Sequence, residues 1–281
     1  MRHITVITVL SFIAASALAQ LPTKMEISRM LQPQSEQFAF TASIRQAWGM
    51  RLNPASIGNM YGVNLMYNVY EEQGKLLEHE ILFQNYLFNF SWRRALSSGR
   101  EYRVDHFSLC MGLGMPEFLV GGSLQWLSSD LPENKRGILW SLGTLMKVNE
   151  YLTLAMTKRN MNQPIIGGVT VHGIQSVGAV VRPFKNSERL LIAFDWSLAN
   201  NQRLRDGSFK IGVDGRILKN LRLFGSFEHR PDETGNIVML GIRLNAPYFA
   251  FGINSAFNGL KKYANSVASV LLSPEQRGLQ Y

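Results

Sequence analysis

Apolar side chains alternate with small or polar ones in successive runs along the chain from residue 38 onward. In the run 188–198, one set of alternate positions is entirely apolar: Leu190, Ile192, Phe194 and Trp196. The positions between them are mixed: Arg189, Leu191, Ala193, Asp195 and Ser197. Because successive side chains of a β-strand point to opposite faces, a period of two is typical of strands. The pattern predicts an all-β protein with antiparallel strands.

The chemistry of the two faces indicates where these strands lie. A soluble sandwich turns its apolar face inward and a richly charged face to water. Here the second face is rich in Gly, Ala, Ser, Asn and isolated charges, and only 17% of all residues are charged, against about 25% in soluble domains. That arrangement suits lipid outside and a polar lumen inside. We therefore expect an antiparallel up-and-down transmembrane β-barrel, with a secreted soluble β-protein as the alternative.

Fourteen runs qualify as strands, and twelve remains the alternative count. Most have the roughly 9 to 11 residues that cross a bilayer at a tilt, and an even number lets a bacterial barrel close. The predicted strands cover residues 38–44, 60–70, 80–93, 101–114, 118–128, 137–147, 150–158, 172–183, 188–198, 206–216, 219–229, 235–245, 247–257 and 264–272. Several large aromatic residues near strand ends suit an interfacial girdle, although a soluble core is the other interpretation: Trp92, Trp126, Trp140, Tyr151 and Trp196.

The first residues have the features of a signal peptide. A short cationic start precedes an apolar run over residues 4–15, and small residues follow at Ala17 and Ala19. The alternative, a membrane anchor, would need about 20 apolar residues. Cleavage between Ala19 and Gln20 is expected. The predicted domains are a signal peptide at 1–19, a periplasmic or luminal segment at 20–37, an outer-membrane barrel at 38–272 and a tail at 273–281.

Charge and cysteine content constrain the partners. The formal net charge of +9 suits an anionic partner, either nucleic acid or an acidic membrane surface. Export and the scattered basic residues favour the membrane, so we expect contact with outer-membrane lipid and lipopolysaccharide and no nucleic acid. The single cysteine, Cys110, cannot form an intramolecular disulfide and is expected to be buried.

The sequence carries no catalytic or metal-binding motif of the common kinds, such as a Gly-x-Ser-x-Gly elbow, a His-Glu-x-x-His pair or a phosphate loop. We therefore expect no enzyme activity, no catalytic residues, no cofactor and no metal site. An outer-membrane lipid hydrolase is the competing class, because one serine and one histidine brought together by a barrel would suffice for it.

Charged residues at positions assigned to the inner face are the candidate functional residues. They either line a channel or pair across strands and close it: Arg182, Asp195, Lys210, Asp214, Arg222, Glu228 and Arg243. Since fourteen strands lie between small filled barrels and porins of about 16 to 18 strands, we expect a narrow or plugged lumen.

Two stretches resemble known outer-membrane barrels. The run 47–50 followed by Asn53, Pro54 and Ala55 resembles the FadL- and PorV-like group, which carries Asn-Pro-Ala just before an early strand. An Asn-Pro pair starts a turn and Pro54 cannot donate to a ladder, so a place at the rim or in a short plug is expected. The stretch 140–272 resembles the barrel domain fused to signal peptide peptidase A-type proteases. The protease residues have no counterpart here, so proteolysis is not carried over.

These observations predict a membrane-embedded platform or a passive conduit for hydrophobic or small solutes. The resemblances imply assembly by the barrel assembly machinery and a link to protein secretion or envelope proteolysis through a periplasmic or secretion partner. The expected location is the bacterial outer membrane.

Overall fold

A computed structural model describes residues 22–32, 39–42, 49–59, 62–86, 88–184, 189–231, 236–258 and 263–272. The predicted cleavage site at Ala19 and Gln20 and the predicted tail at 273–281 lie outside these residues. None of the helices in the described part of the chain is long and apolar enough to cross a membrane.

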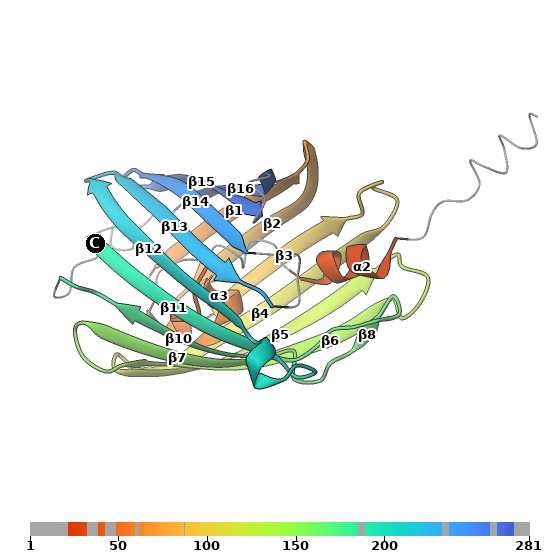
Figure 1. Ribbon diagram of the computed structural model, residues 1–281, viewed down its shortest axis with the longest axis horizontal. Helices are drawn as coiled ribbons and strands as arrows, with labels where there is room; N and C mark the ends of the chain where they lie inside the picture. Colours follow the sequence, from red (N-terminus) through yellow and green to blue (C-terminus); the bar gives the residue numbers. More distant parts are fainter. Residues whose placement is uncertain are drawn as a thin grey trace, which may run out of the picture.

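Fourteen antiparallel strands among the described residues close into one barrel (Figure 1). Their bounds are β1 Val63–Glu72, β2 Lys75–Asn85, β3 Phe88–Leu96, β4 Arg103–Met115, β5 Phe118–Ser129, β6 Arg136–Lys147, β7 Leu152–Arg159, β10 Ile174–Val181, β11 Leu190–Ala199, β12 Ser208–Leu218, β13 Leu221–His229, β14 Ile237–Asn245, β15 Phe249–Asn258 and β16 Tyr263–Leu272. Neighbours in sequence pair with each other, and β1 pairs with β16 to complete the ring. The predicted barrel and the count of fourteen are confirmed.

Two of the predicted strands were wrong. One of them does not form and the other is two strands, so the total of fourteen is unchanged. No strand forms within the described residues of 38–44, because Ala39 to Ala42 form an irregular segment and a turn that is buried on every side. The predicted strand 80–93 is in fact parts of β2 and β3, which are joined by a tight turn at Tyr86. No glycine or proline marks that turn in the sequence, so the alternation reads as continuous across it.

The outer face of the barrel is apolar along its strands. On β1, Asn64, Met66 and Asn68 are buried inside, whereas Leu65 and Tyr67 are more than 40% exposed. One cross-strand row of outward residues is Tyr67, Ile81, Trp92, Phe107, Trp126 and Ile138. Two positions further along, the row begins with Val69 on β1 and is polar from β2 to β6: His79, Arg94, Asp105, Ser128 and Arg136. This change from aromatic to polar side chains is what a membrane interface requires.

The connections divide the barrel into two ends. At one end, which we call the turn end, most are short: residues 116–117, 148–151, 219–220 and 246–248, with 182–189 as a longer exception. At the opposite end, the loop end, most are longer: residues 97–102, 130–135, 160–173 and 200–207, with the turn at 73–74 as a short exception. The longest contains a small hairpin of β8 (Ile165–Ile166) and β9 (Val169–Thr170), and residues 204–206 form the short 3-10 helix η3. Strand β1 begins at the turn end.

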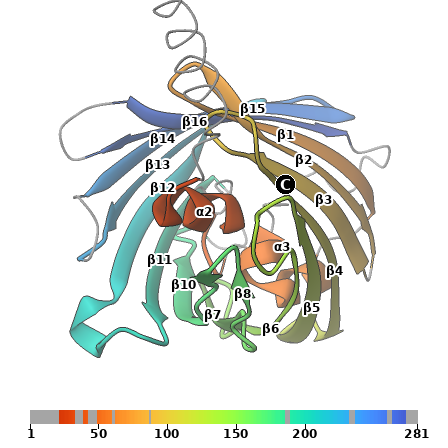
Figure 2. The same cartoon turned by 90° about the vertical axis from the view of Figure 1, so that its right-hand side faces the viewer.

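The described residues between 22 and 59 lie within the barrel or at its loop end (Figure 2). They form α2 (Lys24–Leu31), α3 (Gly49–Leu52) and η2 (Pro54–Asn59). Thr23 caps α2 by accepting a hydrogen bond from the Glu26 amide. Helix α2 lies at the loop end, where Arg29 donates to the Leu96 carbonyl at 2.8 Å. Helix η2 packs against β4, β5 and β6. We call the described residues 22–59 the plug.

The outer face gives the first prediction. Leu240, in the middle of β14, and Leu244, near its turn end, both point outward and are 56% and 51% exposed. An arginine at the bilayer midplane costs about 2 to 4 kcal/mol, and this falls to about 0 to 1 kcal/mol near the interface. We expect Leu240→Arg to lower the free energy of unfolding by the larger amount and Leu244→Arg by the smaller. Reversible urea unfolding in lipid vesicles measures both, and equal losses would contradict a lipid-facing β14.

Candidate functional site in the lumen

The Asn53-Pro54-Ala55 motif lies inside the barrel as part of the plug. The Asn53 amide nitrogen donates to the Thr144 carbonyl at 3.0 Å and to the Thr41 carbonyl at 3.1 Å. Its side-chain oxygen accepts from the Ala55 amide at 3.0 Å, which starts the turn of η2. Asn53 and Ala55 are fully buried. One side chain thus ties two parts of the plug to β6 of the barrel.

Two glycines of the barrel wall make room for this motif. A Cβ atom at Gly121 of β5 would overlap the backbone of Pro54 and Ala55, and one at Gly143 of β6 would overlap the Asn53 side chain. Gly121 and Gly143 are direct cross-strand partners. The wall therefore has a two-residue recess against which the plug backbone rests.

A second contact joins the plug to another part of the wall, on β11 and β12. Asp195 of β11 accepts hydrogen bonds from the Thr41 amide at 2.7 Å and the Thr41 hydroxyl at 3.1 Å. Its cross-strand partner Lys210 donates to the Ala39 carbonyl at 2.7 Å. Phe40 packs edge-on against Phe224 of β13, with ring centroids 6.3 Å apart. Two opposite charges on the wall thus satisfy the backbone of an irregular segment that has no ladder of its own.

A third contact is a buried charge cluster on β2, β3 and β4. Arg93 pairs with Glu78 at 2.7 Å and contacts His106 at 2.9 Å. It also donates to the carbonyl of Gln32 in the plug, at 2.9 Å. Beside it, Arg51 of the plug pairs with Glu80 at 2.8 Å. These side chains are almost fully buried.

Sequence reasoning missed this cluster because it treated residues 80–93 as one strand. In an unbroken strand, Glu80 and Arg93 would lie on opposite faces, since their numbers differ by an odd amount. The turn at Tyr86 reverses the parity, so both side chains point into the lumen. The sequence did contain one signal of this cluster: the aromatic-rich stretch 83–92 is preceded by the acidic Glu80 and followed by the basic Arg93.

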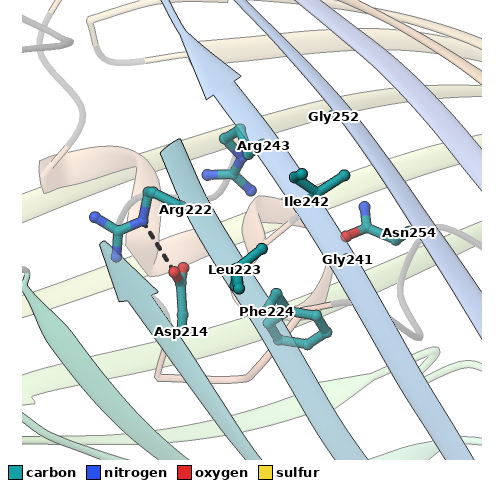
Figure 3. Close-up of a pocket in the computed structure, with 9 residues that line it drawn as sticks. All are labelled: Asp214, Arg222, Leu223, Phe224, Gly241, Ile242, Arg243, Gly252 and Asn254. Atoms are coloured by element: carbon teal, nitrogen blue, oxygen red, sulfur yellow. Dashed lines mark hydrogen bonds and ion pairs between the residues drawn. The ribbon is translucent and has the colours of Figure 1, made fainter. Parts of the chain in front are cut away.

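The structure brings together only some of the seven predicted luminal residues. Asp195 and Lys210 are neighbours at the plug, whereas Asp214, Arg222 and Arg243 lie together nearer the turn end (Figure 3). Of the other two, Glu228 of β13 lies directly opposite Lys210, and Arg182 directly follows β10. Arg182 donates to the Thr153 hydroxyl at 2.7 Å, and Glu228 pairs with Arg230 at 2.6 Å.

One part of the inner wall is apolar. The inward side chains of β1, β2, β14, β15 and β16 form a cluster with Leu52 and Ile57 of the plug. We call these wall residues the apolar wall: Met66, Tyr70, Leu82, Met239, Ala256 and Val267. The plug covers these side chains, which are almost fully buried.

The histidines do not converge on one site. In the described residues each has a different neighbour: His79 contacts Tyr67, His106 contacts Arg93, His172 contacts Asn201 and His229 contacts Asn236. No group of three His, Cys, Asp or Glu side chains in the same part of the chain is placed to hold a metal ion. Cys110 is buried with a free thiol.

Comparison with known proteins gives a likeness in structure. No protein-family model matches the sequence, and no curated protein is similar to it in sequence. The monoaromatic hydrocarbon channel CymD superposes with a TM-score of 0.59 and 11% identity, covering 85% of this chain and 96% of that chain. The P. putida toluene transporter TodX superposes with a TM-score of 0.51 and 11% identity, covering 80% of this chain and 92% of that chain. The Acinetobacter baumannii outer membrane protein Omp33 superposes with a TM-score of 0.52 and 10% identity, covering 77% of this chain and 99% of that chain.

The fold is a closed β-barrel similar to those of CymD, TodX and Omp33. At these identities the likeness concerns the fold alone, and it confirms the barrel part of the resemblance seen in the sequence. The relation to PorV and to the peptidase-fused barrels stays a prediction.

Proposed function

We propose that this chain is a non-enzymatic channel of the bacterial outer membrane and a passive conduit for small hydrophobic solutes. The apolar wall is the observation that carries the proposal. A hydrocarbon gains nothing from a polar lumen, whereas the apolar wall offers it a cluster of apolar side chains inside the barrel. The fold likeness to a monoaromatic hydrocarbon channel and a toluene transporter supports the same solute class.

Passage through the barrel requires the plug to shift. Leu52 and Ile57 pack on the apolar wall, and Ile57 is completely buried. Polar contacts that hold the plug include those of Asn53, Thr41 and Arg51 described above. A solute that competes for the apolar wall would displace plug side chains without breaking strand pairing. The strands of the barrel thus stay in place, and the plug is the element that changes position.

Uptake by cells tests the proposal. Expression in a Gram-negative host without a hydrocarbon channel should raise the initial uptake of labelled toluene several-fold and leave glucose permeation unchanged. Met239→Gln places a polar group on the apolar wall and should reduce toluene uptake, because an unpaired buried amide costs about 1 to 3 kcal/mol. Met25→Gln, the same change at a position that is 84% exposed, is the matched control. Unchanged toluene uptake, or a rise in glucose permeation, would refute a hydrophobic conduit.

The proposal includes two features that rest on the sequence alone. Export by a cleaved signal peptide, followed by insertion through the barrel assembly machinery into a lipopolysaccharide-containing membrane, would place the protein where this function needs it. A secretion or proteolysis partner follows only from the sequence resemblance, and co-purification of a periplasmic protein after crosslinking would support it.

A further inference from the structure

One aromatic side chain of the plug fills a recess in the wall of the barrel. Phe40 is 3% exposed, and its ring lies over Gly212 of β12, where a Cβ atom would come within 2.5 Å of the ring atom Cζ. Phe224 of β13, which is labelled in Figure 3, meets the Phe40 ring edge-on. The recess thus holds one aromatic ring, and it exists because residue 212 has no side chain.

The recess also presents polar groups to the ring. The Lys210 ammonium nitrogen lies 4.5 Å from the centroid of the Phe40 ring, within the range of a cation–π contact. Ser226 of β13, directly opposite Gly212, is 7% exposed, and its buried hydroxyl has no hydrogen-bond partner among the described residues. A buried hydroxyl without a partner is unfavourable. We call Lys210, Gly212, Phe224 and Ser226 the ring slot.

The unpaired hydroxyl belongs to a residue beside the inner edge of the ring. The Ser226 Cβ atom and the Phe40 Cζ atom lie 2.9 Å and 2.5 Å from the same point, the position of a Cβ atom at Gly212. Phe40 has no polar group with which to bond Ser226. A ring in the same place that carries a hydroxyl could bond the Ser226 Oγ as donor or as acceptor. The slot therefore suits a phenol better than the ring that occupies it.

The ring slot adjoins the apolar wall. Ser226 lies directly opposite Met239 of β14, which is a residue of the apolar wall. Phe224 packs against the apolar wall and also against the cluster that contains Phe40. A solute on the apolar wall is thus one strand away from the ring slot.

We propose that the ring slot binds the aromatic ring of a phenolic solute, and that Phe40 occupies the slot as a built-in competitor until the solute displaces it. This inference rests on the proposed function and narrows its solute class to single rings that carry a hydroxyl. The segment Ala39 to Ala42, which Asp195 and Lys210 hold through its backbone, must shift for the exchange. One ring then replaces another in the slot, and a hydrogen bond to Ser226 is gained.

Fluorine NMR of the purified full chain in lipid nanodiscs tests the slot with two probes, 4-fluorophenol and fluorobenzene. Empty nanodiscs correct for partition into lipid. We expect saturable binding of 4-fluorophenol to the unmodified chain. Ser226→Ala should weaken it about three- to tenfold, the range that one hydrogen bond gives, and leave the binding of fluorobenzene unchanged. Ser128→Ala, the same change at an exposed position of the outer face, is the matched control.

A second set of variants tests the competition with Phe40. Phe40→Ala removes the built-in ring and should tighten the binding of 4-fluorophenol about tenfold or more, because the slot no longer has to be vacated. Adding Gly212→Ala should reverse this gain, since its Cβ atom projects into the slot. Adding Gly215→Ala instead should not, because a Cβ atom there meets only Leu190 side-chain and Arg189 backbone atoms, at 3.8 and 3.9 Å.

Two results would overturn the proposal. One is the lack of saturable 4-fluorophenol binding to the unmodified chain, and the other is equal binding by Ser226→Ala and Ser128→Ala. Heat-modifiable gel mobility confirms that each variant is a folded barrel. Since toluene has no hydroxyl, loss of the Ser226 effect with intact toluene uptake refutes the ring slot alone. Absent toluene uptake with an intact Ser226 effect refutes the hydrocarbon conduit alone.

Discussion

Gly121→Ala is expected to release the plug from its recess and raise the conductance of the barrel. The added Cβ would overlap the backbone of Pro54 and Ala55, which cannot rotate out of the way as a side chain can. Overpacking of this kind costs about 1 to 3 kcal/mol. If that cost falls on the docked state, the ratio of undocked to docked plug rises about 5- to 150-fold. Single-channel recording in planar bilayers would show the shift as more frequent or longer openings.

The neighbouring residue supplies a matched control. Gly122 points outward, and a Cβ there would meet the Leu142 side chain at an ordinary 3.7 Å. Gly122→Ala should leave the recordings unchanged, although it makes the same chemical change one position away. Gly143→Ala, which crowds the Asn53 side chain from the next strand, should act like Gly121→Ala. Identical traces for Gly121→Ala and Gly122→Ala in assembled barrels would show that the recess does not hold the plug.

Glu78→Gln is expected to cause the largest loss of stability. Glu78 pairs with Arg93, whose side chain is 0% exposed, at 2.7 Å. Removing one partner of a buried ion pair leaves an uncompensated charge and costs about 3 to 5 kcal/mol. The free energy of unfolding, measured by urea titration in lipid vesicles, should fall by this amount.

Two further variants separate the buried charge from a general effect of the substitution. Asp206→Asn breaks an exposed pair with Arg205, whose side chain is 76% exposed, and should cost about 0 to 1 kcal/mol. The double variant Glu78→Met with Arg93→Met leaves no unpaired charge and should recover part of the loss. A Glu78→Gln barrel as stable as Asp206→Asn would mean that water reaches Arg93.

Much of the fold could be predicted because the membrane constrains each strand locally. Lipid outside and a lumen inside demand different side chains at alternate positions, so the face of a residue shows in its near neighbours. The outward side chains of β1 and the buried Asp195 of β11 lie on the faces that the alternation predicts. The segment 38–44 misled the prediction, because Phe40 and Thr41 alternate like a strand while the plug buries both. Alternation alone does not distinguish a strand with lipid on one side from a segment surrounded by protein.

The sequence by itself thus determined the class of fold, the faces of most strands and the seven charged candidates for the inner face. Tertiary structure alone decided which of these charges meet. Register between strands is non-local, so nothing near Arg222 in the sequence places it opposite Arg216 and Arg243. The turn at Tyr86 likewise brings Glu78 and Arg93 to the same face through a change of parity that no local signal marks. The plug depends on contacts between residues far apart in the chain, such as Thr41 with Asp195, and on a recess that exists only once β5 and β6 are paired.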